Sequence, residues 1–265
     1  MKKQGFTILE LLVVMAIIAV VMSLLLPALA AARKNALNTD CTANLRSIGQ
    51  ILAEYTTADG GIVPAGVDTT TPAAPQYDWS DALFSFATSG PAVSRYQLPA
   101  ATAALLAGKY AAIFQCPAAD VPDSDPFGLN YAANPNAFVR YAHINITGLL
   151  SNTLLTTSRI LRPCETIAVG DANQGQANGD AGPLMDWNRF VSLSTVDPSQ
   201  PIPPGGVTGQ ANSDYSGRPI SDTGLRFRHF SNSSANGSAN ALYFDGHVET
   251  MPYGMLRQLN VATSY

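Results

Sequence analysis

Residues 1–32 read MKKQG FTILE LLVVMAIIAVVMSLLLPALAAA and are followed by Arg33 and Lys34. From Phe6 to Ala32 the only charged side chain is that of Glu10. Those 27 residues would form a helix about 40 Å long, which is enough to cross a bilayer with some tilt. Because a carboxylate among lipid tails costs a few kcal/mol, this acid indicates a function and predicts a positively charged partner at the same depth.

The residues around Glu10 form a specific motif. Gly-Phe-Thr-Ile-Leu-Glu at residues 5–10, preceded by two lysines, resembles the class III signal of type IV pilins and type II secretion pseudopilins. In that family a prepilin peptidase cuts after the glycine that Gly5 matches, and the new amino terminus, here Phe6, is N-methylated. The resemblance implies that Glu10 meets the Phe6 amine of a neighbouring subunit in a filament. Pro27 matches a proline at which the helix is interrupted inside the filament.

Two simpler interpretations of this stretch remain open. An ordinary secretory signal also has basic residues, an apolar segment and a small-residue cleavage site, for which Ala-Leu-Ala at residues 28–30 would serve. A plain membrane anchor would explain the length of the apolar run. The run is longer than the core of a typical signal, however, and neither interpretation explains Glu10 within its motif.

The helix is predicted to continue beyond the membrane segment, because apolar side chains recur at steps of three and four with polar side chains on the other faces. These apolar positions are Leu37, Cys41, Leu45, Ile48, Leu52 and Tyr55. Asp59-Gly60-Gly61 supplies a stop, since glycine adopts the left-handed cap conformation. We therefore expect a leader at 1–5, a membrane or filament-core half-helix at 6–32, an amphipathic half-helix at 33–58 and a globular head at 59–265.

The expected fold class is α+β, with the long helix packed on a head that contains an antiparallel sheet. Short helices are expected at 81–87 and 100–110, and strands at 110–116, 138–146, 166–169, 225–230 and 241–249. Asp245-Gly246 is a hairpin-turn dipeptide between β-forming residues. Residues 171–224 are rich in Gly, Pro, Ser, Asn and Asp, which indicates surface loops.

Charge and cysteine content limit the functions of this head. After Lys34 the chain has 18 acidic and 11 basic residues, because one of its 19 acids and four of its 15 bases lie at or before that point. This net negative charge argues against a general nucleic-acid surface. Cys41, Cys116 and Cys164 lack the paired short spacings of a zinc site. We expect one disulfide and one buried thiol, with all three pairings open.

The C-terminal region carries a second resemblance. Arg228-His229, followed by Asn-Ala-Leu at 240–242 and Phe-Asp-Gly-His-Val at 244–248, is similar to the closing motif of large-head pilin-like proteins with a His to Asp-Gly motif. Residues 41–49, Cys116-Pro117 and residues 162–171 also resemble landmarks of that group. Fifteen residues separate His229 from Asp245 here, a longer gap than in that group.

His229, Asp245 and His247 are suitable metal ligands by type. The favoured interpretation is structural, with Asp245-Gly246 shaping a turn and the histidines hydrogen-bonded nearby. No catalytic residue and no cofactor is predicted, since no Gly-x-Ser-x-Gly, phosphate-loop or His-Glu-x-x-His motif occurs. Weak calcium candidates, without the EF-hand spacing and better explained as a solvated loop, are Asp120, Asp123 and Asp125.

The sequence therefore favours a structural subunit of a type IV pilus-like or type II secretion pseudopilus filament over an enzyme. By resemblance its partners are copies of itself, other pilin-like subunits, the prepilin peptidase and the assembly machinery of the inner membrane, with the head in the periplasm. The alternative is a membrane-anchored or secreted domain that binds a ligand, such as a glycan, through its loops. A hydrolase using His229 and Asp245 is the weakest hypothesis.

The class III signal generates a prediction about processing. If the resemblance is correct, mass spectrometry of the native protein will show a chain that begins at N-methylated Phe6. A chain that begins near Ala31 would instead establish a secretory signal and contradict the pilin-type interpretation.

Overall fold

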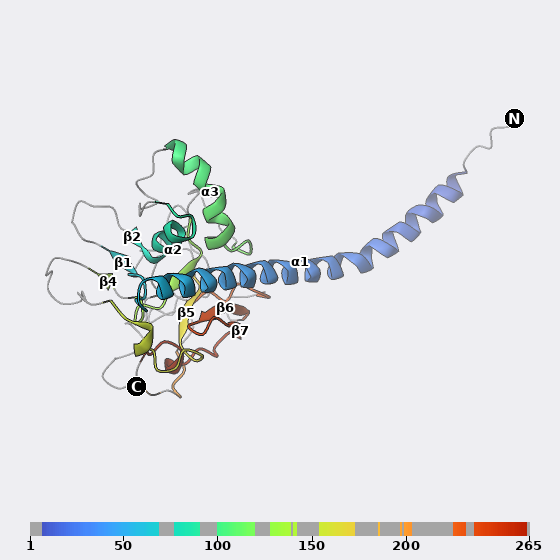
Figure 1. Ribbon diagram of the computed structural model, residues 1–265. Coiled ribbons are helices and arrows are strands. Elements are labelled where there is room, and N and C mark those ends of the chain that lie inside the picture. Colours follow the sequence, from blue (N-terminus) through green and yellow to red (C-terminus); the bar gives the residue numbers. More distant parts are fainter. Residues whose placement is uncertain are drawn as a thin grey trace.

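The computed structural model describes residues 7–68, 77–90, 100–119, 128–138, 140–141, 154–172, 185, 197, 199–202, 225–231 and 236–263. One long helix dominates it: α1 runs from Ile8 to Ala58 and projects far beyond the head at its N-terminal end (Figure 1). Its 51 residues correspond to about 77 Å of helix. The helix ends where Gly60 and Gly61 adopt positive φ, as the Asp-Gly-Gly sequence predicted.

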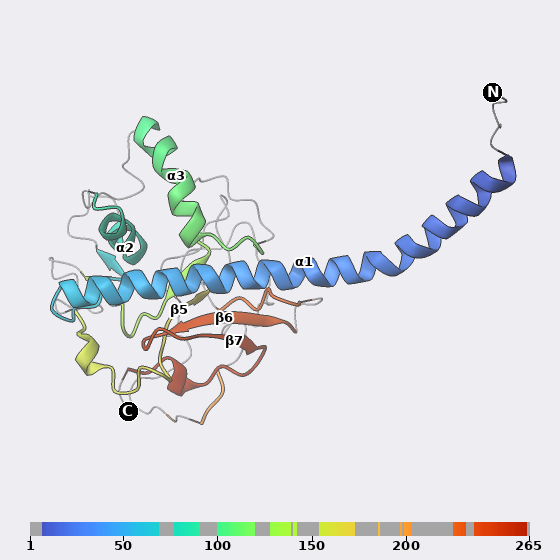
Figure 2. The same cartoon turned by 45° about the vertical axis from the view of Figure 1, so that its right-hand side comes forward.

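The two halves of α1 have different surroundings. Large apolar side chains from Ile8 to Leu29 are exposed, whereas the second half buries one face. The buried residues of that face are Cys41, Leu45, Ile48, Gly49, Leu52 and Thr56. Figure 2 shows the second half lying across the head while the first half stands clear of it. The first half of α1 is therefore bare, and the second half is packed on the head.

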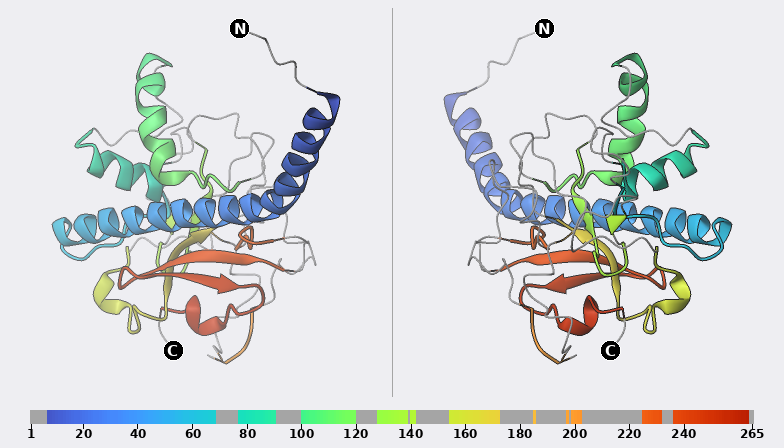
Figure 3. Two further views of the ribbon diagram at one scale, coloured as in Figure 1. Left: turned by 90° about the vertical axis from the view of Figure 1, so that its right-hand side faces the viewer. Right: turned by 90° about the vertical axis from the view of Figure 1, so that its left-hand side faces the viewer.

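A four-stranded antiparallel sheet carries the packed half of α1. Its strands are β3 (Tyr131–Ala133), β5 (Ile167–Asp171), β6 (Ser238–Tyr243) and β7 (Val248–Pro252), in the spatial order β3-β5-β6-β7. All residues of β5 and β6 are buried, because α1 covers one face and a second apolar cluster covers the other. Figure 3 shows α1 running above β6 and β7. The expected α+β fold class is confirmed.

Two further helices and a small second sheet complete the core on the α1 side of the four-stranded sheet. Helix α2 (Trp79–Ala87) begins at the capping residue Asp78, whose side chain accepts hydrogen bonds from the amides of Ser80 and Asp81. Helix α3 (Ala100–Phe114) follows. A small sheet has the order β2-β1-β4, formed by β1 (Val67–Asp68), β2 (Tyr77–Asp78) and β4 (Arg140–Tyr141). Short 3₁₀ turns are η2 (Thr157–Arg159) and η5 (Gln258–Asn260).

Three expected strands differ from the structure. Residues 110–114 belong to α3, because Tyr110 and Phe114, one helical turn apart, stack at 4.6 Å and both enter the core. The segment 225–230 makes only isolated bridges, at Leu225 and His229. Residues 241–249 are not one strand but parts of β6 and β7, which the turn at Asp245-Gly246 separates. Most of the expected strand at 138–146 lies outside the described residues.

Three contacts fix α1 on the head besides apolar packing. A disulfide joins Cys41 of α1 to Cys116, just beyond α3. The Asn44 side chain donates a hydrogen bond of 2.8 Å to the carbonyl of Gln115. Closer to the N-terminal half of α1, the side-chain Nδ2 of Asn240 in β6 donates a hydrogen bond of 2.9 Å to Asn38 Oδ1. The disulfide and the two hydrogen bonds together set both the axial position and the rotation of the helix.

The closest approach of helix to sheet generates a prediction. A Cβ atom at Gly49 of α1 would lie 2.8 Å from Cδ1 of Leu242 in β6, which is buried. Gly49→Val should therefore lower the free energy of unfolding by about 1–3 kcal/mol, measured by thermal unfolding of the full chain in detergent micelles. Gly108→Ala in α3 is the control: it meets no atom within 4 Å, and should stabilise by about 0.5–1 kcal/mol. Equal stability of Gly49→Val and wild type would contradict the close packing of Gly49 against Leu242.

Candidate functional site

The N-terminus of α1 is built around Glu10. Thr7 is the N-cap residue, and its Oγ1 accepts a hydrogen bond of 3.2 Å from the Glu10 amide. In return, Glu10 Oε2 accepts from the amide and the hydroxyl of Thr7, both at 2.8 Å. This reciprocal pair is a capping box, which satisfies amides that a helix start leaves without partners. The predicted processing residues Gly5 and Phe6 lie outside the described residues.

The capping box leaves part of the carboxylate available. Within the described residues, only Oε2 of Glu10 accepts hydrogen bonds, and Oε1 has no partner. A single subunit can thus hold the acid at the end of its apolar helix, with one oxygen still able to accept from a donor on another molecule. Sequence reasoning identified Glu10 but missed the role of Thr7, although Thr-x-x-Glu before an apolar run is the sequence pattern of a capping box.

The bare N-terminal half of α1 is the second component of this site. Among the described residues α1 is the one helix long and apolar enough to cross a membrane, and its most apolar window is fully exposed. Pro27 lies inside α1 and cannot donate the backbone hydrogen bond that a helix interior requires. Figure 3 shows that α1 curves in its N-terminal half. Pro27 therefore marks a weak point in the ladder of backbone hydrogen bonds.

A buried acid–histidine pair lies beneath α1. His229 Nε2 is 3.0 Å from Asp171 Oδ2, and the two side chains are 1% and 0% exposed. The same oxygen accepts a hydrogen bond of 2.7 Å from the Asn240 amide, so the pair links β5 and β6 to the segment 225–231. Burial, reinforced by the Asp171 carboxylate, raises the pKa of neighbouring Tyr131 well above its usual value. The Tyr131 phenol therefore stays protonated. The Asp171–His229 pair, with the Asn240 amide, connects β5, β6 and the segment 225–231.

The disulfide borders this pair. Cys116 Sγ lies 3.9 Å from His229 Nε2, and the ligand atoms of Cys41, Cys116 and His229 lie within 4.8 Å of one another. Thiolate sulfur is the form of cysteine that binds metals, whereas these two sulfurs are bonded to each other. With the disulfide closed the cluster serves as a cross-link. Cys164, the third cysteine, is free and exposed, so the expectation of a buried third thiol is wrong.

The second histidine of the C-terminal motif sits elsewhere. His247 Nδ1 is 2.5 Å from Asp245 Oδ1, both side chains are partly exposed, and the imidazole stacks on Tyr243 at 4.2 Å. Gly246 between them has φ +92°, which favours glycine. The structure thus gives His229 and Asp245 different partners, and it does not bring the motif together as one ligand set. The calcium candidates Asp120, Asp123 and Asp125 lie outside the described residues.

Sequence reasoning missed Asp171 as the partner of His229. The available signal was its position directly after the apolar run Ile-Ala-Val-Gly, where an acid at the end of a buried strand requires a partner. Nothing in the local sequence indicates that the partner is His229, because the pairing depends on the antiparallel alignment of β5 with β6.

Comparison with known proteins gives one family match. Residues 1–26 match the model described as the prokaryotic N-terminal methylation motif. No curated protein and no solved structure matches the chain significantly. The chain therefore carries a class III signal at its N-terminus, and the long apolar helix packed on a four-stranded antiparallel sheet makes it pilin-like. The likeness of its head to the large-head group stays an expectation.

The two acid–histidine pairs generate a contrasting prediction. His229→Ala leaves the buried Asp171 carboxylate without its imidazole partner, and should lower the free energy of unfolding by about 3 kcal/mol. His247→Ala removes a partly exposed pair, and should cost less than about 1 kcal/mol. Thermal unfolding of both full-length variants in the same detergent measures the difference. Equal losses of unfolding free energy in the two variants would mean that the buried His229–Asp171 pair stabilises the head no more than the exposed His247–Asp245 pair does.

Proposed function

We propose that this protein is a structural subunit, or a priming subunit, of a type IV pilus-like or type II secretion pseudopilus filament. Prepilin peptidase cleaves the chain after Gly5 and so removes residues 1–5. Phe6 then becomes the N-methylated amino terminus. Residues 6–32 then form the membrane and filament-core half of the helix, residues 33–58 the amphipathic half, and residues 59–265 the head. Before assembly the protein spans the inner membrane once with its head in the periplasm.

The observation that carries this proposal is Glu10 at the start of a bare apolar helix. The exposed apolar side chains from Ile8 to Leu29 require a nonpolar environment, which lipid supplies first and neighbouring helices supply in a filament. A carboxylate in that environment needs a positive charge. The amine of Phe6 on an adjacent subunit is such a charge, and its donation to the available Oε1 leaves the capping box with Thr7 in place.

This arrangement supports assembly as the function. One ion pair between Glu10 and the neighbouring Phe6 amine would set the axial offset of successive subunits, because any other offset leaves a charge desolvated without a partner. The partners are then further copies of this chain, other pilin-like subunits and the inner-membrane machinery that extracts them.

Two substitutions of Glu10 separate assembly from helix capping. Glu10→Gln keeps an acceptor for Thr7 but removes the charge, while Glu10→Val removes both. In a host that carries the cognate machinery, both variants should insert and be cleaved after Gly5, yet lose most sedimentable filaments. The measurement pairs the precursor-to-mature ratio on gels with the filament yield after shearing.

A bulky residue in place of Gly5 serves as the control, because it should fail earlier and leave uncleaved precursor in the membrane. Normal filament yield from both Glu10 variants would contradict the role of the charge. A normal filament yield from Glu10→Gln alone would mean that Glu10 acts only as a helix-capping residue and that its charge is not needed for assembly.

A further inference from the structure

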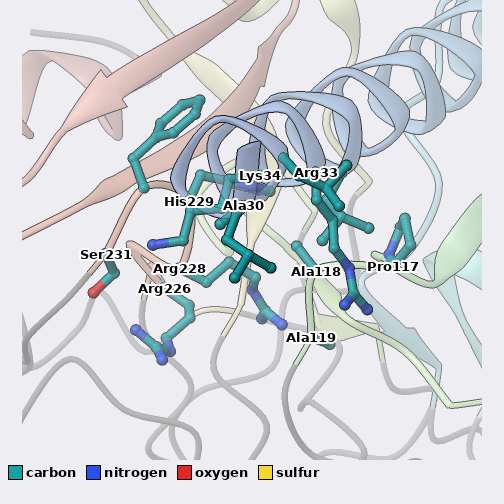
Figure 4. Close-up of a pocket in the computed structure, with 14 residues that line it drawn as sticks. Ala30, Arg33, Lys34, Pro117, Ala118, Ala119, Arg226, Arg228, His229 and Ser231 are labelled. Carbon is teal, nitrogen blue, oxygen red and sulfur yellow. The ribbon is translucent and has the colours of Figure 1, made fainter. Parts of the chain in front are cut away.

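A cavity of about 720 Å³ lies where α1 leaves its membrane half and meets the head (Figure 4). One wall comes from α1 between Leu26 and Leu37, and the other from residues 117–119 and from the segment 226–231. The function proposed above assigns no role to this cavity. Its place at the base of the head distinguishes it from the assembly site at Glu10.

The head end of the cavity is strongly basic. Arg33 and Lys34 enter from α1, and Arg226 and Arg228 from the opposite wall, with His229 beside them. No acidic residue belongs to the described lining of the cavity. The chain beyond Lys34 carries a net negative charge, so these cations make the cavity positive on an otherwise negative head. The concave shape of the cavity strengthens the positive potential inside it.

The four cations are held differently. Arg226 and Arg228 are each only 7% exposed, and Arg228 Nη2 donates to the carbonyl of Ala172, so their positions are fixed by the head. Arg33 and Lys34 are exposed, and within the described residues neither makes an ion pair or a side-chain hydrogen bond. The helix thus contributes two cations that are available to an anion.

The membrane end of the cavity is apolar. Leu26 and Leu29 line it and are 66% and 67% exposed. Along α1 the lining therefore changes from leucine to arginine and lysine within two turns of helix. An occupant that satisfies both ends has an apolar chain on the membrane side and a negative charge on the head side.

The position of the cavity along the membrane normal agrees with an occupant that is apolar at one end and charged at the other. The hydrocarbon core of a bilayer is about 30 Å thick, which is about 20 residues of helix. Counted from Phe6, that length ends near Leu25, so that Leu26 to Arg33 fall at the level of the lipid headgroups.

We propose that this cavity binds an anionic phospholipid, with the headgroup phosphate against Arg33 and Lys34 and an acyl chain along Leu26 and Leu29. Arginine and lysine donate charge-assisted hydrogen bonds to phosphate oxygens, and each cation near an anionic membrane strengthens binding about fivefold. The inference requires insertion of α1 into a membrane but not filament assembly. Bound lipid would hold the base of the head at the membrane surface until the subunit is extracted.

Native mass spectrometry of the delipidated full chain in detergent micelles tests this site. The probes are phosphatidylglycerol and phosphatidylcholine with identical acyl chains, and inorganic phosphate alone. Wild type should prefer phosphatidylglycerol by about tenfold or more, and Arg33→Gln/Lys34→Gln should lose roughly 20-fold in affinity for it. Arg46→Gln/Lys109→Gln removes two exposed cations outside the cavity, and should bind as wild type within about twofold.

Equal binding of the two lipids by wild type, or equal losses in both double variants, would overturn the proposal. Tight binding of inorganic phosphate that displaces phosphatidylglycerol would assign the cavity to a soluble anion instead. Flotation of the wild-type chain with vesicles checks insertion of α1 independently, so that failure of the membrane half is not mistaken for failure of the cavity.

Discussion

Helix α1 is one continuous helix whose two halves need different surroundings, and the rest of the protein is arranged around it. Its first half exposes apolar side chains all round, which suits lipid or a bundle of like helices, and its second half is buried on one face only. Because the helix is continuous, the rotation of the packed half also sets the rotation of the bare half. The hydrogen bonds of Asn38 and Asn44 and the disulfide of Cys41 therefore influence how the bare half is oriented, although none of these residues lies in it.

The head is organised to receive this helix. Strand β6 alternates Asn240 and Leu242 toward α1 with Ala241 and Tyr243 in the opposite core, as the two-residue period of a strand requires. The small residue Gly49 lets the helix approach Leu242 closely. Behind this contact, the buried Asp171–His229 pair ties β5 to the segment that also carries Arg226 and Arg228. Helix position, sheet and basic cavity are thus parts of one connected arrangement.

The sequence predicted what local chemistry determines. The continuous helix, its end at Asp59-Gly60-Gly61, the strand before Asp171 and the turn at Asp245-Gly246 follow from periodicity and turn residues. It failed at Tyr110–Cys116, where β-forming residues join a helix because Tyr110 and Phe114 pack into the core together. The disulfide and the partner of His229 could not be predicted, because both join segments that are far apart in sequence.

In the proposed filament, Glu10 keeps its capping box with Thr7 and gains an ion pair that the free subunit lacks. A cryo-EM reconstruction of filaments from a host with the cognate machinery measures this directly. We expect the Glu10 carboxylate to lie within about 4 Å of the N-methylated amine of Phe6 on a neighbouring subunit, with the exposed apolar half of α1 enclosed in the filament core. A reconstruction in which Glu10 contacts only its own Thr7, with no neighbouring amine within that distance, would contradict it.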